Sequence, residues 1–132
     1  MAEAEKRILI VDDEADIIEL LTVMLKGQGY SVLTAVDGQE ALEKARKEKP
    51  DLIILDIMLP KIDGFKVARM LKFDESYSSI PIIMLTAKIR EKDREMGMET
   101  GADFYMTKPF ESGMILLKVK ELLAKQGVEE QG

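Results

Sequence analysis

A ten-residue stretch in the middle of the chain, DLIILDIMLP at positions 51–60, places the strongest constraint on the fold. Leu52 to Leu55 are four consecutive apolar residues, a run typical of a strand covered on both faces, as in a parallel sheet between helix layers. Asp56 follows directly, and Pro60 and the Asp63-Gly64 pair then predict a loop. Asp56 therefore falls at the carboxyl end of a buried strand, where open α/β sheets place their ligand sites. On this stretch alone, Asp56 is equally well interpreted as the first solvated residue after a strand.

Composition limits the chemistry that such a site can carry. A chain of 132 residues is long enough for one domain, residues 1–132, with a single core expected at about 6–125. The formal net charge of -6 argues against binding to nucleic-acid phosphates or an anionic membrane, which require a basic surface. The sequence has neither a signal-peptide pattern nor an apolar run of about 18 residues, so we expect a cytoplasmic protein with no membrane segment.

The chain contains no cysteine and no histidine. The first absence removes disulfides, a thiol nucleophile and thiolate metal sites. The second removes the commonest metal ligand and the commonest general base. Any metal bound here must therefore be a hard cation held by oxygen ligands.

Short apolar runs alternate with amphipathic stretches along the whole chain. The predicted strands are residues 8–11, 30–36, 52–55, 80–85 and 103–107. The predicted helices follow Glu14, Asp37, Asp63, Lys88 and Glu111, and the last is expected to end at about Lys125, ahead of a flexible tail at 126–132. Such alternation predicts an α/β fold with a parallel sheet and helices on both of its faces. The fourth helix, 89–100, has few apolar residues and an internal glycine, which predicts loose packing.

Polar residues follow four of the five predicted strands. Asp12 and Asp13 follow the first strand, Asp56 the third, Thr86 the fourth and Lys108 the fifth. Because the carboxyl ends of parallel strands share one edge of the sheet, we expect these side chains to line one cleft. Clustered carboxylates raise one another's pKa values unless a cation lies among them, and an all-oxygen set favours Mg²⁺. A carboxylate beside such an ion, with a lysine and a threonine near it, is suited to accepting a phosphoryl group.

The motifs at these positions resemble those of one family. They are VDD at 11–13, LDIMLPKIDG at 55–64, LTA at 85–87 and GADFYMTKPF at 101–110. Together they make the chain similar, from about residue 6 to residue 125, to the receiver domain of two-component response regulators. The resemblance implies a flavodoxin-like, doubly wound fold with a five-stranded parallel sheet in the order 2-1-3-4-5 and five helices.

The resemblance also implies roles for the residues of the cleft. By it, Asp56 is the phosphoacceptor. Asp12 and Asp13 hold Mg²⁺ together with Asp56 and the main-chain carbonyl of Met58. Lys108 pairs with the phosphoryl group.

Further roles implied by the resemblance concern the switch and the lifetime of the phosphorylated state. Thr86 and Tyr105 match the family's switch residues. Met58 and Lys88 lie at the mouth of the cleft, where the hydrolytic water approaches. The Lys108-Pro109 bond is expected to be cis.

Partners follow from the same chemistry. A chain without histidine cannot itself donate from a phosphohistidine, so the phosphoryl group must come from a sensor histidine kinase, a histidine phosphotransfer protein or a small phosphodonor. Phosphorylation is expected to switch the face formed by the fourth helix, fifth strand and fifth helix, and so to control an output protein or an output domain removed from the chain. The same face is a possible dimer contact. We expect a signalling domain, not an enzyme, without direct contact to nucleic acid.

Each motif has a simpler interpretation when it is taken alone. Asp12 and Asp13 favour a helix N-terminus, a common role for acidic residues. Thr86 is typical of a cap, Lys108 of a solvated lysine and Tyr105 of strand packing. The coincidence of all of them at the strand ends favours the functional interpretation.

Three other protein classes compete with the receiver interpretation. A phosphatase of the haloacid dehalogenase type also uses an Asp nucleophile, but its general acid is an Asp at the position of Met58. A flavodoxin-like flavin carrier needs a phosphate-binding loop after the first strand, and Asp12, Asp13 and Glu14 would repel phosphate. A degenerate receiver used only for docking would not need the intact acidic cluster.

Overall fold

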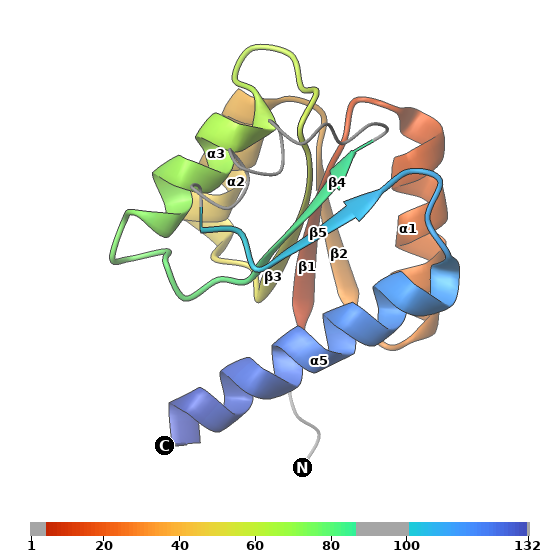
Figure 1. Ribbon diagram of the computed structural model, residues 1–132, viewed down its shortest axis with the longest axis vertical. Coiled ribbons are helices and arrows are strands. Elements are labelled where there is room, and N and C mark those ends of the chain that lie inside the picture. The colour runs from red at the N-terminus through yellow and green to blue at the C-terminus, as the bar shows by residue number, and fades with distance from the viewer. Residues whose placement is uncertain (1–4, 87–100, 132) are drawn as a thin grey trace.

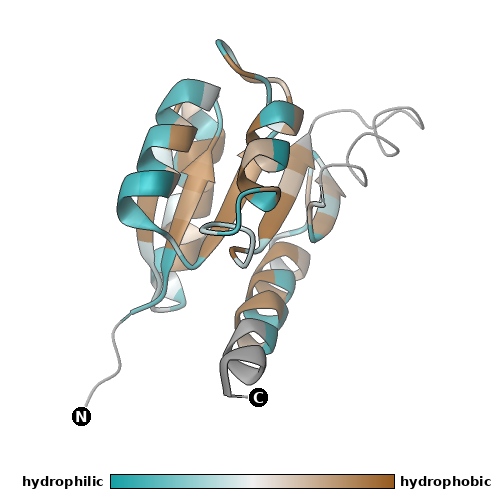
Figure 2. Ribbon diagram, turned by 90° about the vertical axis from the view of Figure 1, so that its left-hand side faces the viewer, coloured by the Kyte–Doolittle hydropathy of each residue, from teal (hydrophilic) through white to brown (hydrophobic). Residues whose placement is uncertain are grey.

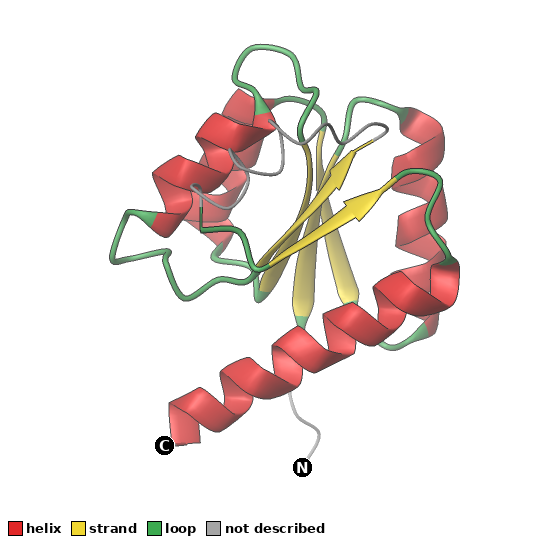
Figure 3. Ribbon diagram, in the orientation of Figure 1, coloured by secondary structure: helices red, strands yellow, loops and turns green. Residues whose placement is uncertain are grey.

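The computed structural model describes residues 5–86 and 101–131. It contains a five-stranded parallel sheet in the order β2-β1-β3-β4-β5, which confirms the predicted fold class (Figures 1 and 3). The strands are β1 (Arg7–Val11), β2 (Ser31–Ala35), β3 (Leu52–Asp56), β4 (Ile82–Thr86) and β5 (Phe104–Thr107).

Four helices lie among the described residues, two on each face of the sheet (Figure 1). They are α1 (Ala15–Gly27), α2 (Gly38–Glu48), α3 (Gly64–Lys72) and α5 (Ser112–Gln131). The helix expected at 89–100 lies outside the described residues. Within the part of the chain that the structure describes, no helix is long and apolar enough to cross a membrane.

The central strands are buried on both sides, as the apolar runs predicted. Alternate residues of each strand enter two separate cores: Leu9 and Ile53 face α2 and α3, while Ile8 and Ile54 face α1 and α5. Figure 2 shows this layering as hydrophobic strands between helices whose outer surfaces are more hydrophilic. All five residues of β3 are buried, so its last residue, Asp56, is a buried carboxylate at the end of the sheet.

Two Asp-Gly pairs begin the helices that cover the side of the sheet formed by α2 and α3. The carboxylate of Asp37 accepts a hydrogen bond from the main-chain N–H of Glu40 at 2.8 Å, which confirms the predicted N-cap of α2. Asp63 caps α3 in the same way, through the N–H of Lys66 at 3.0 Å. Gly64 lies so close to β3 that a Cβ there would be 2.7 Å from the Cα of Ile57. Only glycine lets α3 begin this close to Asp56.

The structure corrects one predicted end. The last helix does not stop near Lys125 but runs to Gln131. Glutamine and glutamate make up most of the extra segment and are good helix formers, and the single Gly127 costs only about 1 kcal/mol in a helix. That cost is too small to end a helix by itself. The expected flexibility of the tail at 126–132 stays a prediction.

Candidate functional site

Asp12 and Asp56 meet at the carboxyl edge of the sheet because β1 and β3 are neighbours. Val11 is in register with Leu55, so the next residue of each strand projects at the same edge. Both aspartates are almost inaccessible, with 1% and 3% of their surface exposed. Burying two carboxylates side by side is costly without a compensating cation. The position of these residues therefore indicates a functional site.

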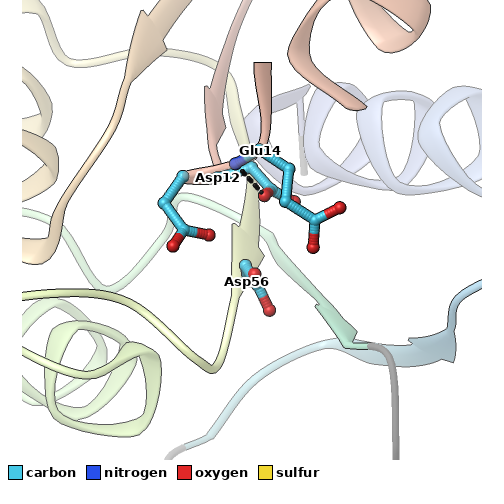
Figure 4. Close-up of side chains that lie close together, drawn as sticks. Asp12, Glu14 and Asp56 are labelled. Atoms are coloured by element: carbon cyan, nitrogen blue, oxygen red, sulfur yellow. Dashed lines mark hydrogen bonds between the residues drawn. The ribbon is translucent and has the colours of Figure 1, made fainter. Parts of the chain in front are cut away.

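Two more carboxylates complete an acidic cluster at this edge. Carboxylate oxygens of Asp12, Asp13, Glu14 and Asp56 all lie within 4.8 Å of one another, and Figure 4 shows three of these side chains close together. Asp13 and Glu14 are exposed, whereas the other two are buried. Asp12 is held in place by the main-chain N–H of Glu14, which donates to its Oδ1 at 2.8 Å. The predicted convergence of Asp12, Asp13 and Asp56 is thus confirmed.

Lys108 supplies the cation of the cluster. Its Nζ lies 2.7 Å from Asp12 Oδ2, 3.4 Å from Asp56 Oδ2 and 3.4 Å from Glu14 Oε1. Only 9% of its side chain is exposed, so its contacts with the buried Asp12 and Asp56 are shielded from solvent, whereas Glu14 is 57% exposed. The Lys108-Pro109 bond is cis, as predicted. The ammonium offsets part of the repulsion between the two buried carboxylates.

The pKa values of the buried groups record this balance. Burial is the main cause that raises the pKa of Asp56, and the neighbouring carboxylate of Asp12 raises it further, while Lys108 works in the opposite direction. For Lys108, burial pulls the pKa down, but the hydrogen bond to Asp12 and the charges of Asp56, Asp12 and Glu14 outweigh burial and raise it. The charged form of Asp56 is therefore disfavoured, while the neighbouring Lys108 stays protonated.

Of the remaining predicted residues, the structure describes Met58, Thr86 and Tyr105 but not Lys88. The side chain of Met58 is 73% exposed beside the acceptor, and its main-chain N–H donates to Asp56 Oδ1 at 3.3 Å. Thr86 is the last residue of β4 and lies in register with Thr107. Tyr105 lies on β5 and packs, half-buried, against the core on the side of α2 and α3. Lys88 lies outside the described residues.

Sequence reasoning missed one member of the cluster. Glu14 contacts Lys108 and shares the site with the three aspartates. It was read only as a charge after the first strand, although the unbroken DDE run at 12–14 was the available signal. The same reasoning did not connect Asp37 with the loop after Asp56, a contact that no local pattern shows.

The chemistry of the donor set fits Mg²⁺. Its ligands are all carboxylate oxygens, two of them at the cleft surface, and hard divalent cations prefer such ligands while keeping some water. Within the described parts of the chain, Asp12, Asp13, Glu14 and Asp56 are the only group of three or more acidic residues with this spacing.

Comparison with known proteins decides the family. The family model of the response regulator receiver domain matches residues 8–120. The chain belongs to this family. The receiver domain is 50% identical over 123 residues to the alkaline phosphatase synthesis transcriptional regulatory protein PhoP of Bacillus subtilis, which covers 93% of this chain and 50% of that protein. It is 41% identical over 129 residues to the DNA-binding response regulator MtrA of Mycobacterium tuberculosis, covering 98% of this chain and 55% of MtrA.

A solved structure matches the receiver domain over almost all of its fold. The receiver domain of the sensor histidine kinase PA1611 from Pseudomonas aeruginosa PAO1 superposes with a TM-score of 0.84 at 30% identity, covering 92% of this chain and 99% of that one. That structure has a magnesium ion coordinated in its active-site cleft. The chain spans about half the length of the curated relatives named above.

The pKa of Asp56 leads to a prediction about stability in the absence of metal. Because this pKa is raised, the folded protein binds the proton more tightly than the unfolded chain, whose carboxyl keeps a value near 3.8. Ionisation of Asp56 therefore lowers the free energy of unfolding as the pH rises through the interval above 3.8. In chelator at pH 7, we expect Asp56→Asn to raise the thermal midpoint by roughly a few degrees.

The pH dependence separates this effect from a general gain in stability. The advantage of Asp56→Asn should shrink as the pH falls toward 4. Asp16→Asn, which removes one exposed carboxylate outside the cluster, is the variant for comparison. Thermal unfolding followed by circular dichroism across this range measures both. A constant difference between Asp56→Asn and wild type would contradict the raised pKa.

Proposed function

We propose that this receiver domain accepts a phosphoryl group on Asp56 from a phosphohistidine of a partner. The observation that carries the proposal is the position of Asp56 at the end of β3, buried, 3.4 Å from the ammonium of Lys108 and beside Asp12. A carboxylate oxygen of Asp56 forms the new P–O bond while the bond from phosphorus to the histidine nitrogen breaks. The electron pair of that bond stays on the ring, which takes up one proton from solvent. The products are an acyl phosphate on Asp56 and a neutral histidine on the partner.

The chain's own residues prepare this transfer by positioning and charge. Phosphoryl transfer demands little covalent chemistry from a protein and mainly needs charge stabilisation. Lys108 is already beside Asp56 Oδ2 and stays protonated, so it can pair with the oxygens of the incoming group without a proton transfer. The N–H of Met58 holds Asp56 Oδ1, which orients the carboxylate.

We further propose that Mg²⁺ binds to Asp12, Asp13 and Asp56, with the main-chain carbonyl of Met58 as an additional ligand. The clustered carboxylate oxygens support the three aspartates as ligands, and the Met58 carbonyl is the ligand that the family resemblance implies. When bound, the ion supplies positive charge that offsets the charge on the transferring group. Asp12 and Asp13 would then supply the negative charge that holds the ion.

The biological setting is part of the proposal. We expect a sensor histidine kinase or histidine phosphotransfer protein as donor, in the cytoplasm, and a signalling role without multiple turnover of a substrate. Two relatives are named as a transcriptional regulatory and a DNA-binding protein, and this chain spans only half of each. We therefore propose that any contact with DNA is made by another domain. The phosphorylated receiver would control that domain through the face of β5, α5 and the helix expected at 89–100, or through dimers formed there.

Phosphorylation itself is the first test. Incubation with Mg²⁺ and a small acyl phosphate should add one phosphate to the wild-type chain, as seen by intact-protein mass spectrometry. Asp56→Asn should take up none, because the amide is a poor nucleophile. Asp51→Asn, which changes an aspartate at the opposite end of β3, is the matched control. Equal labelling of Asp56→Asn and wild type would refute the assignment.

The lifetime of the acyl phosphate is expected to depend on the mouth of the cleft. We propose that Met58, exposed beside Asp56, and Lys88 control the approach of the hydrolytic water. Replacing both with small polar residues should change the rate of phosphoryl loss several-fold and leave the acceptor intact. The rate is measured by the decay of the phosphorylated mass after removal of donor. Identical decay curves would show that these side chains do not govern water access.

The conformational switch forms the next prediction. We propose that the Thr86 hydroxyl moves toward the roughly two added negative charges and that Tyr105 then turns inward beside β4. Thr86→Ala should still accept phosphate but respond weakly. Hydrogen exchange with and without beryllofluoride measures the response. If changes in protection stay near Asp56 and do not reach residues 87–108, this switch is absent.

A further inference from the structure

The loop between β3 and α3 follows Asp56 directly and forms part of the site. It also contacts the start of α2. This acceptor loop, residues 57–63, includes Met58, whose main chain contacts Asp56. Its inner hydrogen bonds run from the N–H groups of Leu59 and Gly64 to the carbonyl of Ile57, at 3.0 and 2.8 Å. Its outer part, residues 60–62, packs against the beginning of α2.

The contact between α2 and the acceptor loop leaves no free space. The N–H of Gly38 donates to the carbonyl of Pro60 at 3.2 Å, and the same carbonyl accepts from Ile62 at 2.8 Å. A Cβ at Gly38 would overlap the main-chain carbonyl group of Ile62 and lie 2.7 Å from the Ile62 Cβ. Any side chain at position 38 would therefore push the loop away from α2.

An ion pair closes the same contact. Asp37 Oδ2 lies 3.4 Å from Lys61 Nζ, while Asp37 Oδ1 caps α2 through Glu40. The Asp37 side chain is 13% exposed and that of Lys61 61% exposed. The hydrogen bond from Glu40 is the main cause that lowers the pKa of Asp37, with Lys61 adding to it. Asp37 thus stays charged and joins α2 to the loop.

The loop conformation needs such support. Lys61 has a φ of 69°, in the left-handed region that non-glycine residues adopt only at a cost. Contacts outside the loop must therefore hold this backbone. Among the described residues, Asp37 and Gly38 at the start of α2 contact residues 60–62.

We propose that Asp37, Gly38 and Lys61 are positioning residues for the phosphoacceptor site. They fix the acceptor loop against α2, and the loop in turn sets the main chain of Met58 beside Asp56. This inference rests on the proposed function, since its consequence is the strength of Mg²⁺ binding and the rate of phosphorylation. None of the three residues touches the reacting atoms.

Two single substitutions separate positioning from simple charge effects. Asp37→Asn keeps a good N-cap but removes the ion pair, and Lys61→Met removes it from the other side. A long-range charge effect would weaken Mg²⁺ binding in Asp37→Asn and strengthen it in Lys61→Met. Positioning predicts weaker binding in both, by about two- to fivefold, the range open to a partly exposed ion pair.

The design is completed by matched controls. The double variant should bind Mg²⁺ no more weakly than either single one, because both remove the same interaction. Lys61→Arg should restore wild-type affinity. Lys47→Met makes the same charge change on an exposed residue of α2 and should leave the affinity unchanged.

Glycine substitutions test the close contact independently. Gly38→Ala should weaken Mg²⁺ binding by roughly tenfold or more, as changes to the groups that orient metal ligands do. It should also slow phosphorylation by a small acyl phosphate, because the loop must shift. Gly113→Ala is the matched control near the start of α5, where a Cβ meets nothing within 4 Å. Isothermal titration calorimetry gives the affinities, and circular dichroism checks that each variant is folded.

The outcomes distinguish the positioning role from the proposed function. Opposite shifts of Mg²⁺ affinity in Asp37→Asn and Lys61→Met, or wild-type affinity in a folded Gly38→Ala, would overturn the positioning role while leaving the proposed function intact. Absence of both Mg²⁺ binding and phosphorylation in the wild-type chain would overturn the proposed function itself. If Gly38→Ala does not fold, the comparison of the two ion-pair variants still decides.

Discussion

The ammonium of Lys108 between two buried carboxylates is the interaction on which the site depends. Asp12 and Asp56 are almost inaccessible to solvent at the edge of the sheet, where two adjacent negative charges repel strongly. With Lys108 at 2.7 Å and 3.4 Å, one positive charge is shared between them. The cluster still has an excess of negative charge, because Glu14 and Asp13 lie at its rim. A site left short of positive charge in this way is prepared for a divalent cation.

The fold produces this arrangement through simple geometry. Parallel strands bring their carboxyl ends to one edge, and the order β2-β1-β3-β4-β5 places β1 beside β3. The crossover connections then diverge from this point, since the chain runs from β1 outward to β2 and returns to β3. The diverging loops leave a gap that side chains such as Lys108 and Asp56 can fill. Burial of β3 on both faces explains why the pKa of Asp56, at the end of this strand, is raised.

Much of this could be predicted from the sequence, because its signals are local. The four apolar residues before Asp56, the capping Asp37 and the alternation of strand and helix patterns each depend on a few neighbouring residues. The convergence of Asp12, Asp13 and Asp56 followed from one rule about parallel sheets. The strand order and the cis bond before Pro109 came from family resemblance. The end of α5 was predicted too early because the last residues of a chain are often frayed, and a flexible tail was expected from residue 126 on.

What sequence reasoning could not supply are contacts set by tertiary packing. The DDE run hints that Glu14 belongs with the aspartates, but its contact with Lys108, 94 positions further along the chain, is visible only in the structure. The ion pair of Asp37 with Lys61 depends on how closely α2 approaches the acceptor loop, and that approach is set by the missing side chain of Gly38. An Asp-Gly pair reads in the sequence as a helix start and nothing more. In the structure, Asp37 also forms an ion pair with Lys61, and Gly38 packs against the main chain of Ile62. One short motif therefore both begins a helix and supports the neighbouring site.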